Sequence, residues 1–315
     1  MKPAIFTSLA IKTGRAIALA LTILSCSPRK PAEPLRFGIL PDADSLPFMV
    51  AEAEGLFAKH GATVELVPFV NAQERDAAIQ AGRIDGALAD ILAAAFLVAG
   101  GFDMRVTSAS DGRYGIAAAP GSGVTTVADL RGKRIGMSTN TIIQYSVDAM
   151  ASVAGLPQSA YESIAVPKMP VRMEMLLAGQ IDAAGLPEPL LTAAVARGAI
   201  LVGTTDESGI DAAVMLFSKA VLDGRLDEVR KLYASYAEAT DRINANPESY
   251  RDFLVGKAAF PAEVRDAYRF VSYRKPVLPD TAQIEAALEW MKARKLLSRT
   301  LSAADLLDGR AIAAW

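Results

Sequence analysis

Apolar positions in the first part of the chain switch between short strand-like runs and longer segments with helical spacing. An apolar run over 35–40 predicts a strand, and the pattern over 46–60 predicts a helix. A β-branched run over 63–68, a helix with a capping-box start over 71–82 and an apolar run over 84–88 follow. This alternation of strands and helices predicts a parallel α/β sheet.

The same pattern occurs a second time. Residues 75–85 align without gaps with residues 172–182 at an offset of 97 (172 − 75), and residues 36–39 align with residues 134–137 at an offset of 98 (134 − 36). Because two separate segments share nearly one offset, we interpret the chain as two related lobes rather than as a chance match. The second copy predicts strands over 133–137, 164–166 and 181–186, with helices over 141–154 and from Pro170.

The chain becomes largely helical from Lys219 onward. One face of the first long helix carries Leu226, Val229, Leu232, Tyr233 and Tyr236 at three- and four-residue spacing, which is typical of core packing. We expect these helices to pack back on the first lobe, so that the chain crosses between lobes twice, near 113–118 and 212–217. The predicted boundaries are residues 35–112 plus 213–315 for the first lobe and residues 113–212 for the second.

The amino terminus has the pattern of an export signal. Basic residues precede an apolar run over 16–24, and Ile23-Leu24-Ser25-Cys26 resembles a bacterial lipobox, whose cysteine receives a diacylglyceryl group. The alternatives are a transmembrane anchor, for which the run has about half of the roughly 20 apolar residues needed, and a plain secretory leader. We therefore predict a lipoprotein signal peptide over 1–26, lipidation at Cys26 and a tether over 27–34. The protein would work outside the cytoplasm, in the periplasm or at the cell surface, anchored to a membrane.

Composition and charge exclude several classes of function. The net charge of −2 and the absence of a basic stripe argue against a nucleic-acid partner. The single histidine, His60, follows a lysine and precedes a glycine at a predicted helix end, so surface capping is expected rather than a catalytic pair. The chain has no metal-binding or phosphate-loop motif, and we expect no metal, no cofactor and no enzymatic activity.

Candidate ligand-binding residues follow from the predicted sheets, because open α/β sheets bind ligands beyond the carboxyl ends of their strands. The Ser138–Thr141 run suits either an oxyanion or simple helix capping, and Asp90 with Glu188 would accept N–H groups of a ligand or face solvent. Tyr114 would stack on a flat ligand or pack in the core. The candidates are Asp42, Asp44, Ser45, Leu46, Asp90 and Ile91 in the first lobe, Ser138, Thr139, Asn140, Thr141, Pro187 and Glu188 in the second, and Tyr114 near the first crossing.

Five segments in a fixed order carry a family resemblance. They are Phe37-Gly-Ile-Leu-Pro-Asp-Ala-Asp-Ser-Leu-Pro47, Ala51-Glu-Ala-Glu-Gly-Leu-Phe57, Ala81-Gly-Arg-Ile-Asp-Gly-Ala-Leu-Ala-Asp90, Asp129-Leu-Arg-Gly-Lys-Arg-Ile-Gly136 and Gly179-Gln-Ile-Asp-Ala-Ala184. Together they resemble the nitrate/sulfonate/taurine class of ABC-transporter substrate-binding proteins, which includes pyrimidine-precursor binders related to thiamine metabolism.

The resemblance implies a type II periplasmic-binding-protein fold, with two parallel-sheet lobes joined by a two-strand hinge that close on a small molecule. It also implies delivery to an ABC permease with a cytoplasmic ATPase, and we expect a monomer. The ligand would be a sulfonate such as taurine, nitrate or a pyrimidine-like compound, and the acidic Asp42 and Asp44 favour an amine-bearing or heterocyclic one. Two alternatives stay open: a pyrimidine-synthase-like enzyme of thiamine biosynthesis on the same fold, and a lipoprotein that senses a solute without transporting it.

Overall fold

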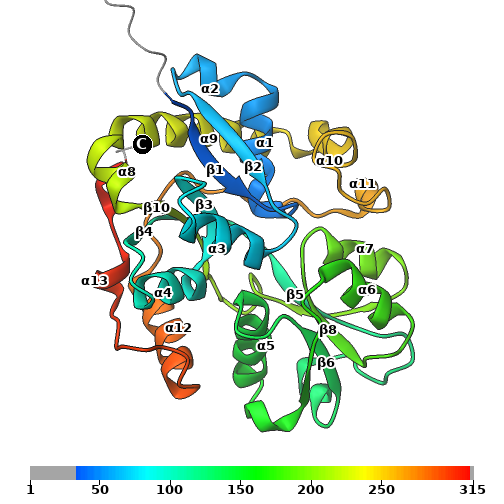
Figure 1. The fold of residues 1–315 in the computed structure, drawn as a ribbon. Coiled ribbons are helices and arrows are strands. Elements are labelled where there is room, and N and C mark those ends of the chain that lie inside the picture. Colours follow the sequence, from blue (N-terminus) through cyan, green and yellow to red (C-terminus); the bar gives the residue numbers. More distant parts are fainter. Residues whose placement is uncertain (1–32, 313–315) are drawn as a thin grey trace, which may run out of the picture. The chain divides into compact units, whose positions relative to one another are not determined.

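The computed structural model describes residues 33–312 (Figure 1). The predicted signal peptide over 1–26, the lipidation site Cys26 and most of the tether over 27–34 lie outside the described residues and stay predictions. Between residues 33 and 312, no helix combines the length and apolar character that crossing a bilayer requires.

Within residues 33–312, ten strands form two five-stranded sheets with the same internal order. The first sheet has the order β2-β1-β3-β10-β4 and the second the order β7-β6-β8-β5-β9. The first consists of β1 (Leu35–Ile39), β2 (Val64–Pro68), β3 (Gly86–Asp90), β4 (Met104–Ala109) and β10 (Ala213–Ser218). The second consists of β5 (Tyr114–Ala118), β6 (Arg134–Met137), β7 (Glu162–Ala165), β8 (Ala183–Pro187) and β9 (Ile200–Thr204).

The prediction of wholly parallel sheets is wrong for one strand in each sheet. Strand β10 runs antiparallel to β3 and β4, and β5 runs antiparallel to β8 and β9. Each of these strands enters directly from the other sheet, through residues 110–113 or 205–212, so no crossover helix turns it into the parallel direction. The two crossings therefore fall beside the strands where the sequence pattern placed them.

Helices cover the two sheets. The α-helices are α1 (Leu46–Ala53), α2 (Leu56–Lys59), α3 (Ala72–Gln80), α4 (Ile91–Ala99), α5 (Ile142–Val153), α6 (Met169–Leu177), α7 (Leu190–Ala196), α8 (Lys219–Gly224), α9 (Leu226–Ala245), α10 (Arg251–Gly256), α11 (Val264–Ala267), α12 (Thr281–Ala293) and α13 (Ala303–Leu306). Short 3₁₀ turns occupy Ala43–Ser45, Val127–Leu130, Gln158–Ala160, Pro247–Tyr250 and Gly309–Ala311.

The single helix predicted over 46–60 is divided in two. Gly55 adopts φ +70° between α1 and α2, a left-handed conformation that glycine tolerates and that interrupts a helix. The predicted cap of the next helix is confirmed, because the Asn71 side chain accepts a hydrogen bond from the Glu74 N–H at 3.0 Å.

The carboxyl-terminal helices pack against elements of the first sheet. Helix α9 lies on α1 and α2, and α12 and α13 lie on α4. Tyr236 stacks on Phe48 at 4.7 Å between ring centroids, and Phe48 in turn contacts Phe37 of β1 at 4.7 Å. The apolar stripe of α9 is thus core, as predicted, and it ties the last third of the chain to the first strand.

The internal repeat extends to matching hydrogen bonds near β1 and β6. The Arg36 N–H donates to the Asp85 carboxylate and the Arg134 N–H to the Asp182 carboxylate, each at 2.8 Å. Such matched side-chain contacts at a spacing of 97 (182 − 85) are what a duplicated strand-helix-strand unit produces.

Candidate ligand-binding site

A cavity lies between the two sheets and draws its walls from both. Seven of the predicted residues line it: Asp42, Asp44, Asp90, Tyr114, Ser138, Thr141 and Pro187. Ten residues outside the list of candidates also line it: Leu40, Asn71, Ala72, Arg75, Leu88, Ala89, Ile142, Ile143, Pro167 and Met169. Its volume of about 70 Å³ is well below the roughly 300–1,000 Å³ of pockets for drug-sized ligands. In this arrangement the cavity suits a solute of few atoms.

Two carboxylates follow β1 at the wall formed by the first sheet. Asp42 accepts a hydrogen bond from the Ser45 hydroxyl at 3.0 Å, and burial raises its pKa to about 6. Asp44 is buried and accepts a hydrogen bond from the Ser110 hydroxyl at 3.1 Å, which places it against the first crossing segment. Burial, reinforced by the nearby charge of Asp42, raises the pKa of Asp44 well above its usual value.

The close approach of Asp44 to the crossing requires a glycine. A Cβ atom at Gly112 would lie 2.4 Å from Asp44 Oδ1 and 2.7 Å from Oδ2, too close for any side chain. Gly112 therefore leaves the space in which this carboxylate sits.

The third carboxylate, Asp90, ends β3 and caps α4. It accepts a hydrogen bond from the Ala93 N–H at 2.9 Å, and burial raises its pKa although the Arg75 charge opposes that shift. Arg75 is itself 2% exposed and donates from Nη1 to the Leu88 carbonyl at 3.1 Å. Its Nη2 lies 2.8 Å from Asp76 Oδ1 but makes no hydrogen bond of good geometry. The charged residues that line the cavity are thus three aspartates and one arginine.

The wall formed by the second sheet is neutral. Thr141 caps α5 by accepting from the Ile143 N–H at 3.2 Å, and it donates to the Ser138 carbonyl at 2.9 Å. The Ser138 hydroxyl accepts a hydrogen bond from Arg172, whose guanidinium is fully buried behind the wall. The cavity therefore meets a hydroxyl rather than the cation itself.

The middle of the predicted Ser138–Thr141 run lies outside the cavity. Thr139 and Asn140 are exposed, Asn140 adopts φ +57°, and its N–H already donates to Gln144 Oε1 at 2.7 Å. Of the two uses weighed for this run, helix capping is supported by the hydrogen bonds of Thr141.

Four other candidates also lie outside the cavity. Ser45, Leu46 and Ile91 are fully buried at the starts of α1 and α4, where they pack in the core. Glu188 accepts hydrogen bonds from the Thr192 side chain and N–H at 2.9 and 3.1 Å, and it lines a separate cavity beside α7. The structure therefore does not bring Asp90 and Glu188 together. At the repeat offset of 97 (187 − 90), the residue equivalent to Asp90 is Pro187, which directly precedes Glu188.

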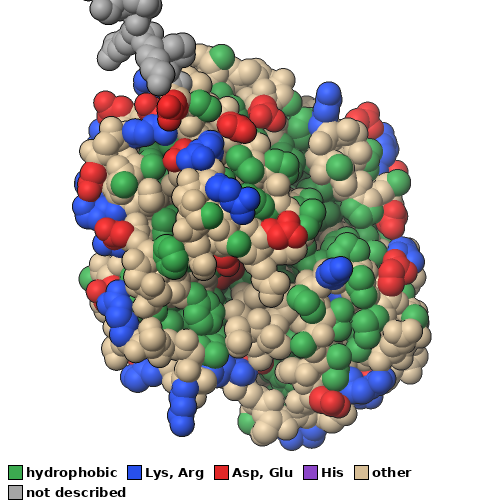
Figure 2. All heavy atoms as spheres, viewed as in Figure 1, with side chains coloured by type: hydrophobic (Ala, Val, Ile, Leu, Met, Phe, Trp, Pro, Cys, Tyr) green, Lys and Arg blue, Asp and Glu red, His purple; other side chains and the backbone are tan. Residues whose placement is uncertain are grey.

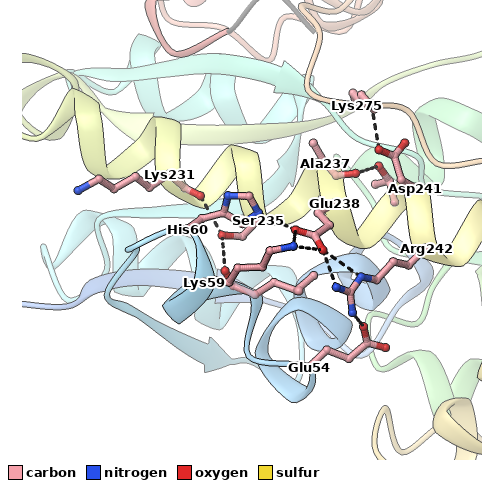
Figure 3. Close-up of polar contacts among 12 residues, drawn as sticks. Glu54, Lys59, His60, Lys231, Ser235, Ala237, Glu238, Asp241, Arg242 and Lys275 are labelled. Carbon is pink, nitrogen blue, oxygen red and sulfur yellow. Dashed lines mark hydrogen bonds and ion pairs between the residues drawn. The ribbon is translucent and has the colours of Figure 1, made fainter.

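The single histidine of the chain, His60, does not line the cavity. His60 Nε2 lies 2.8 Å from Glu238 Oε2, and the same carboxylate accepts from Lys59 Nζ at 2.7 Å (Figure 3). The predicted role of His60 at a helix end on the surface agrees with this arrangement. Among residues 33–312, no three His, Cys, Asp or Glu side chains are grouped so as to hold a metal ion.

Two sheets of this order with a cavity between them define the fold of periplasmic binding proteins. The chain belongs to the NMT1/THI5-like family, whose model matches residues 42–250, more than half of its 315 residues. No curated protein sequence matches the chain significantly.

Solved structures share the fold at low sequence identity. The periplasmic aliphatic sulphonate binding protein SsuA from Escherichia coli is 18% identical, with a TM-score of 0.76 over 87% of this chain and 97% of that one. The periplasmic nitrate-binding protein NrtA from Synechocystis PCC 6803 is 16% identical, with a TM-score of 0.62 over 78% and 74%. The desulfurization enzyme DSZB is 15% identical, with a TM-score of 0.63 over 89% and 97%. These likenesses establish the fold and leave the ligand open, since one fold serves all three proteins.

Proposed function

We propose that this protein is the extracytoplasmic solute-binding component of an ABC importer and that it captures a small cationic or N–H-rich solute between its two sheets. The observation that carries the proposal is the group of carboxylates Asp42, Asp44 and Asp90 on one wall of the cavity. An amine or an aminated heterocycle would donate to these oxygens, whereas an oxyanion would meet their repulsion.

The charge balance of the cavity supports this ligand class. Arg75 is the one cation among the lining residues, and its charge acts on Asp90 and Asp42. The side-chain hydrogen bonds to Asp42 and Asp44 come from two hydroxyl groups, those of Ser45 and Ser110. A ligand ammonium group would add a charged donor beside the half-buried Asp42 and the buried Asp44.

Capture would proceed by closure of the two lobes. The cavity is small and takes its walls from both sheets, so a solute would enter while the sheets stand apart and would be enclosed when they approach. The crossings at 110–113 and 205–212 would form the hinge, and Asp44 lies against the first of them through Ser110. We keep the boundaries 35–112 plus 213–315 and 113–212 for the moving lobes.

Export and anchoring complete the proposal. The apolar run over 16–24 and Cys26 support lipidation, and the similar SsuA and NrtA are described as periplasmic. We propose a monomer held at the membrane by Cys26, which passes its solute to a permease. The full chain expressed in bacteria should carry a diacylglyceryl group on Cys26 by mass spectrometry, and Cys26→Ser should move the protein to the soluble fraction.

We propose no catalysis, although a similar structure is that of an enzyme. The lone histidine is paired with Glu238, and no cysteine follows Cys26. The cavity therefore offers no His- or Cys-based nucleophile pair for covalent chemistry.

A thermal-shift panel tests the ligand class. Small amines and aminopyrimidines should raise the melting temperature, because a solute at about one hundred times its dissociation constant adds about 2.7 kcal/mol to the free energy of unfolding. Nitrate, taurine and alkanesulfonates should not. The shift should disappear in Asp44→Asn and persist in Asp227→Asn, an exposed carboxylate on α9. Stabilisation by the anions alone would refute the proposal.

A further inference from the structure

A buried carboxylate on α5 accepts hydrogen bonds from the end of α12 and from a residue just before β7. Asp148 has a side-chain exposure of 1%, and its Oδ2 accepts from Trp290 Nε1 at 3.0 Å and from the Arg294 guanidinium. Its Oδ1 accepts from the Tyr161 hydroxyl, and burial together with this bond raises the pKa of Tyr161. Both carboxylate oxygens are therefore occupied.

The donors Trp290 and Arg294 belong to the first lobe. They lie at the carboxyl-terminal end of α12, which packs on α4 and α13, beside the first sheet (Figure 1). Asp148 and Tyr161 instead flank the second sheet, on α5 and just before β7. The contact is therefore made across the two lobes.

Aromatic packing surrounds these hydrogen bonds. The Trp290 ring meets Tyr145 of α5 edge to face at 5.7 Å, and the Arg294 guanidinium lies over the Trp290 ring at 4.5 Å. Arg294 Nε is buried and makes no hydrogen bond. Arg294 thus contacts Asp148 and the indole face of Trp290. The indole contact lies within α12, whereas the bonds to Asp148 and the contact of Trp290 with Tyr145 would be lost if α12 moved away from α5.

Asp148, Tyr161, Trp290 and Arg294 do not line the cavity, but Asp148 lies on a helix whose first residues do. Helix α5 begins with Ile142 and Ile143, which line the cavity, and carries Asp148 between one and two turns later. A ligand and the Asp148 cluster would therefore favour the same position of α5 from two different places.

We propose that Asp148, Tyr161, Trp290 and Arg294 form an inter-lobe latch that stabilises the closed arrangement before any ligand binds. The inference rests on the proposed function, because a latch matters only if the lobes separate. Breaking it would shift the ligand-free protein toward open forms without altering any cavity residue.

Distance measurements on the ligand-free protein test the latch. In the full chain with Cys26→Ser, spin labels at Val70→Cys and Val153→Cys would report the separation of the lobes, since these side chains are 68% and 75% exposed. Trp290→Phe keeps an aromatic side chain but removes the indole N–H donor, and Arg294→Gln removes the guanidinium charge. Lys292→Gln is the control, because Lys292 pairs with Glu289 within α12.

We expect one short distance in the unmodified background and in the control, and an additional longer distance in both latch variants. Unchanged distances in the latch variants, with circular dichroism confirming that they are folded, would overturn the latch. Global unfolding in place of lobe opening would also overturn it, since the cluster would then serve the fold. These outcomes need no ligand, so they remain distinct from a solute panel in which the unmodified protein binds nothing.

Discussion

The two walls of the cavity come from one duplicated unit but differ in chemistry. The wall of the first sheet presents Asp42, Asp44 and Asp90, and the wall of the second presents Ser138 and Thr141 with apolar neighbours. Acidic and basic side chains are mixed over the face that Figure 2 shows, whereas the charged residues lining the cavity are three carboxylates and one arginine. The two sheets have the same strand order, but the side chains at the strand ends differ.

The repeated arginines show how this divergence works. Arg75 and Arg172 occupy equivalent positions, and each donates from Nη1 to an equivalent carbonyl, Leu88 at 3.1 Å and Gly185 at 2.7 Å. Arg75 then faces carboxylates and the cavity, whereas Arg172 is enclosed by the Val166 carbonyl and the Ser138 hydroxyl. One copy of the arginine takes part in the charge of the site, and the other supports the wall.

The largest predicted effect separates these two arginines by stability. Arg172→Met should lower the free energy of unfolding by about 3 kcal/mol, because two buried carbonyls and the half-buried Ser138 hydroxyl would lose a charged donor. Arg75→Met should cost about half as much, and the exposed Arg197→Met, which removes a surface pair with Glu174, should cost the least of the three. Urea denaturation measures all three, and equal losses for Arg75 and Arg172 would contradict the comparison.

The second prediction concerns the space beside Asp44. Gly112→Ala should displace the carboxylate and weaken binding of an amine from the solute panel about tenfold, since one charge-assisted hydrogen bond contributes about 1.5 kcal/mol. Gly224→Ala is the matched control, because a Cβ there meets no atom within 4 Å. Equal affinities in the two variants would remove Asp44 from the site.

The third prediction is a pH dependence of stability in the ligand-free protein. Burial raises the pKa of Asp42 from 3.8 to about 6, so between these values the native state holds a proton that the unfolded chain has released. The free energy of unfolding should therefore fall as the pH rises from about 4 to about 6. Urea denaturation at several pH values measures this fall, and Asp42→Asn should make it about 2 kcal/mol smaller. The same pH dependence in the variant would show that the native pKa of Asp42 is not raised.

The smallest predicted effect lies on the outer face of the first lobe. Hydrogen bonds from Lys59, His60 and Arg242 lower the pKa of Glu238 to about 2, so its stabilising contribution is present above pH 4.5 and is lost as the pH falls toward 2. Because Glu238 and its partners lie near solvent, Glu238→Gln should lower the free energy of unfolding by about 0.5 kcal/mol at pH 7. It should leave solute binding unchanged. A change in solute affinity would show that this surface communicates with the cavity.

The architecture was readable from the sequence where a pattern extended over many residues. The alternating strands, the repeat offset and the apolar stripe of α9 each involve many positions, so they predict the order of elements and the two crossings. The antiparallel β5 and β10 were missed because strand direction depends on the path between sheets. The break at Gly55 was missed because one glycine inside a helical pattern does not reveal its φ angle.

The site was harder to predict, because it depends on single positions. Side chains alternate between faces along a strand, so the one-residue difference between Pro187 and Glu188 decides which of them meets the cavity. Arg75 stood in the repeat alignment, but an arginine in a helical segment is ordinarily exposed, and its 2% exposure is a tertiary result. The repeated arginine was the one signal that could have found it.

The most direct test of the central claim is calorimetric titration of the protein with two pyrimidines that differ only in an amino or a sulfonate substituent. The acidic wall predicts that the aminopyrimidine binds at pH 7, that Asp44→Asn abolishes this binding and that the sulfonate does not bind. Tighter binding of the sulfonate, unaffected by Asp44→Asn, would contradict the account.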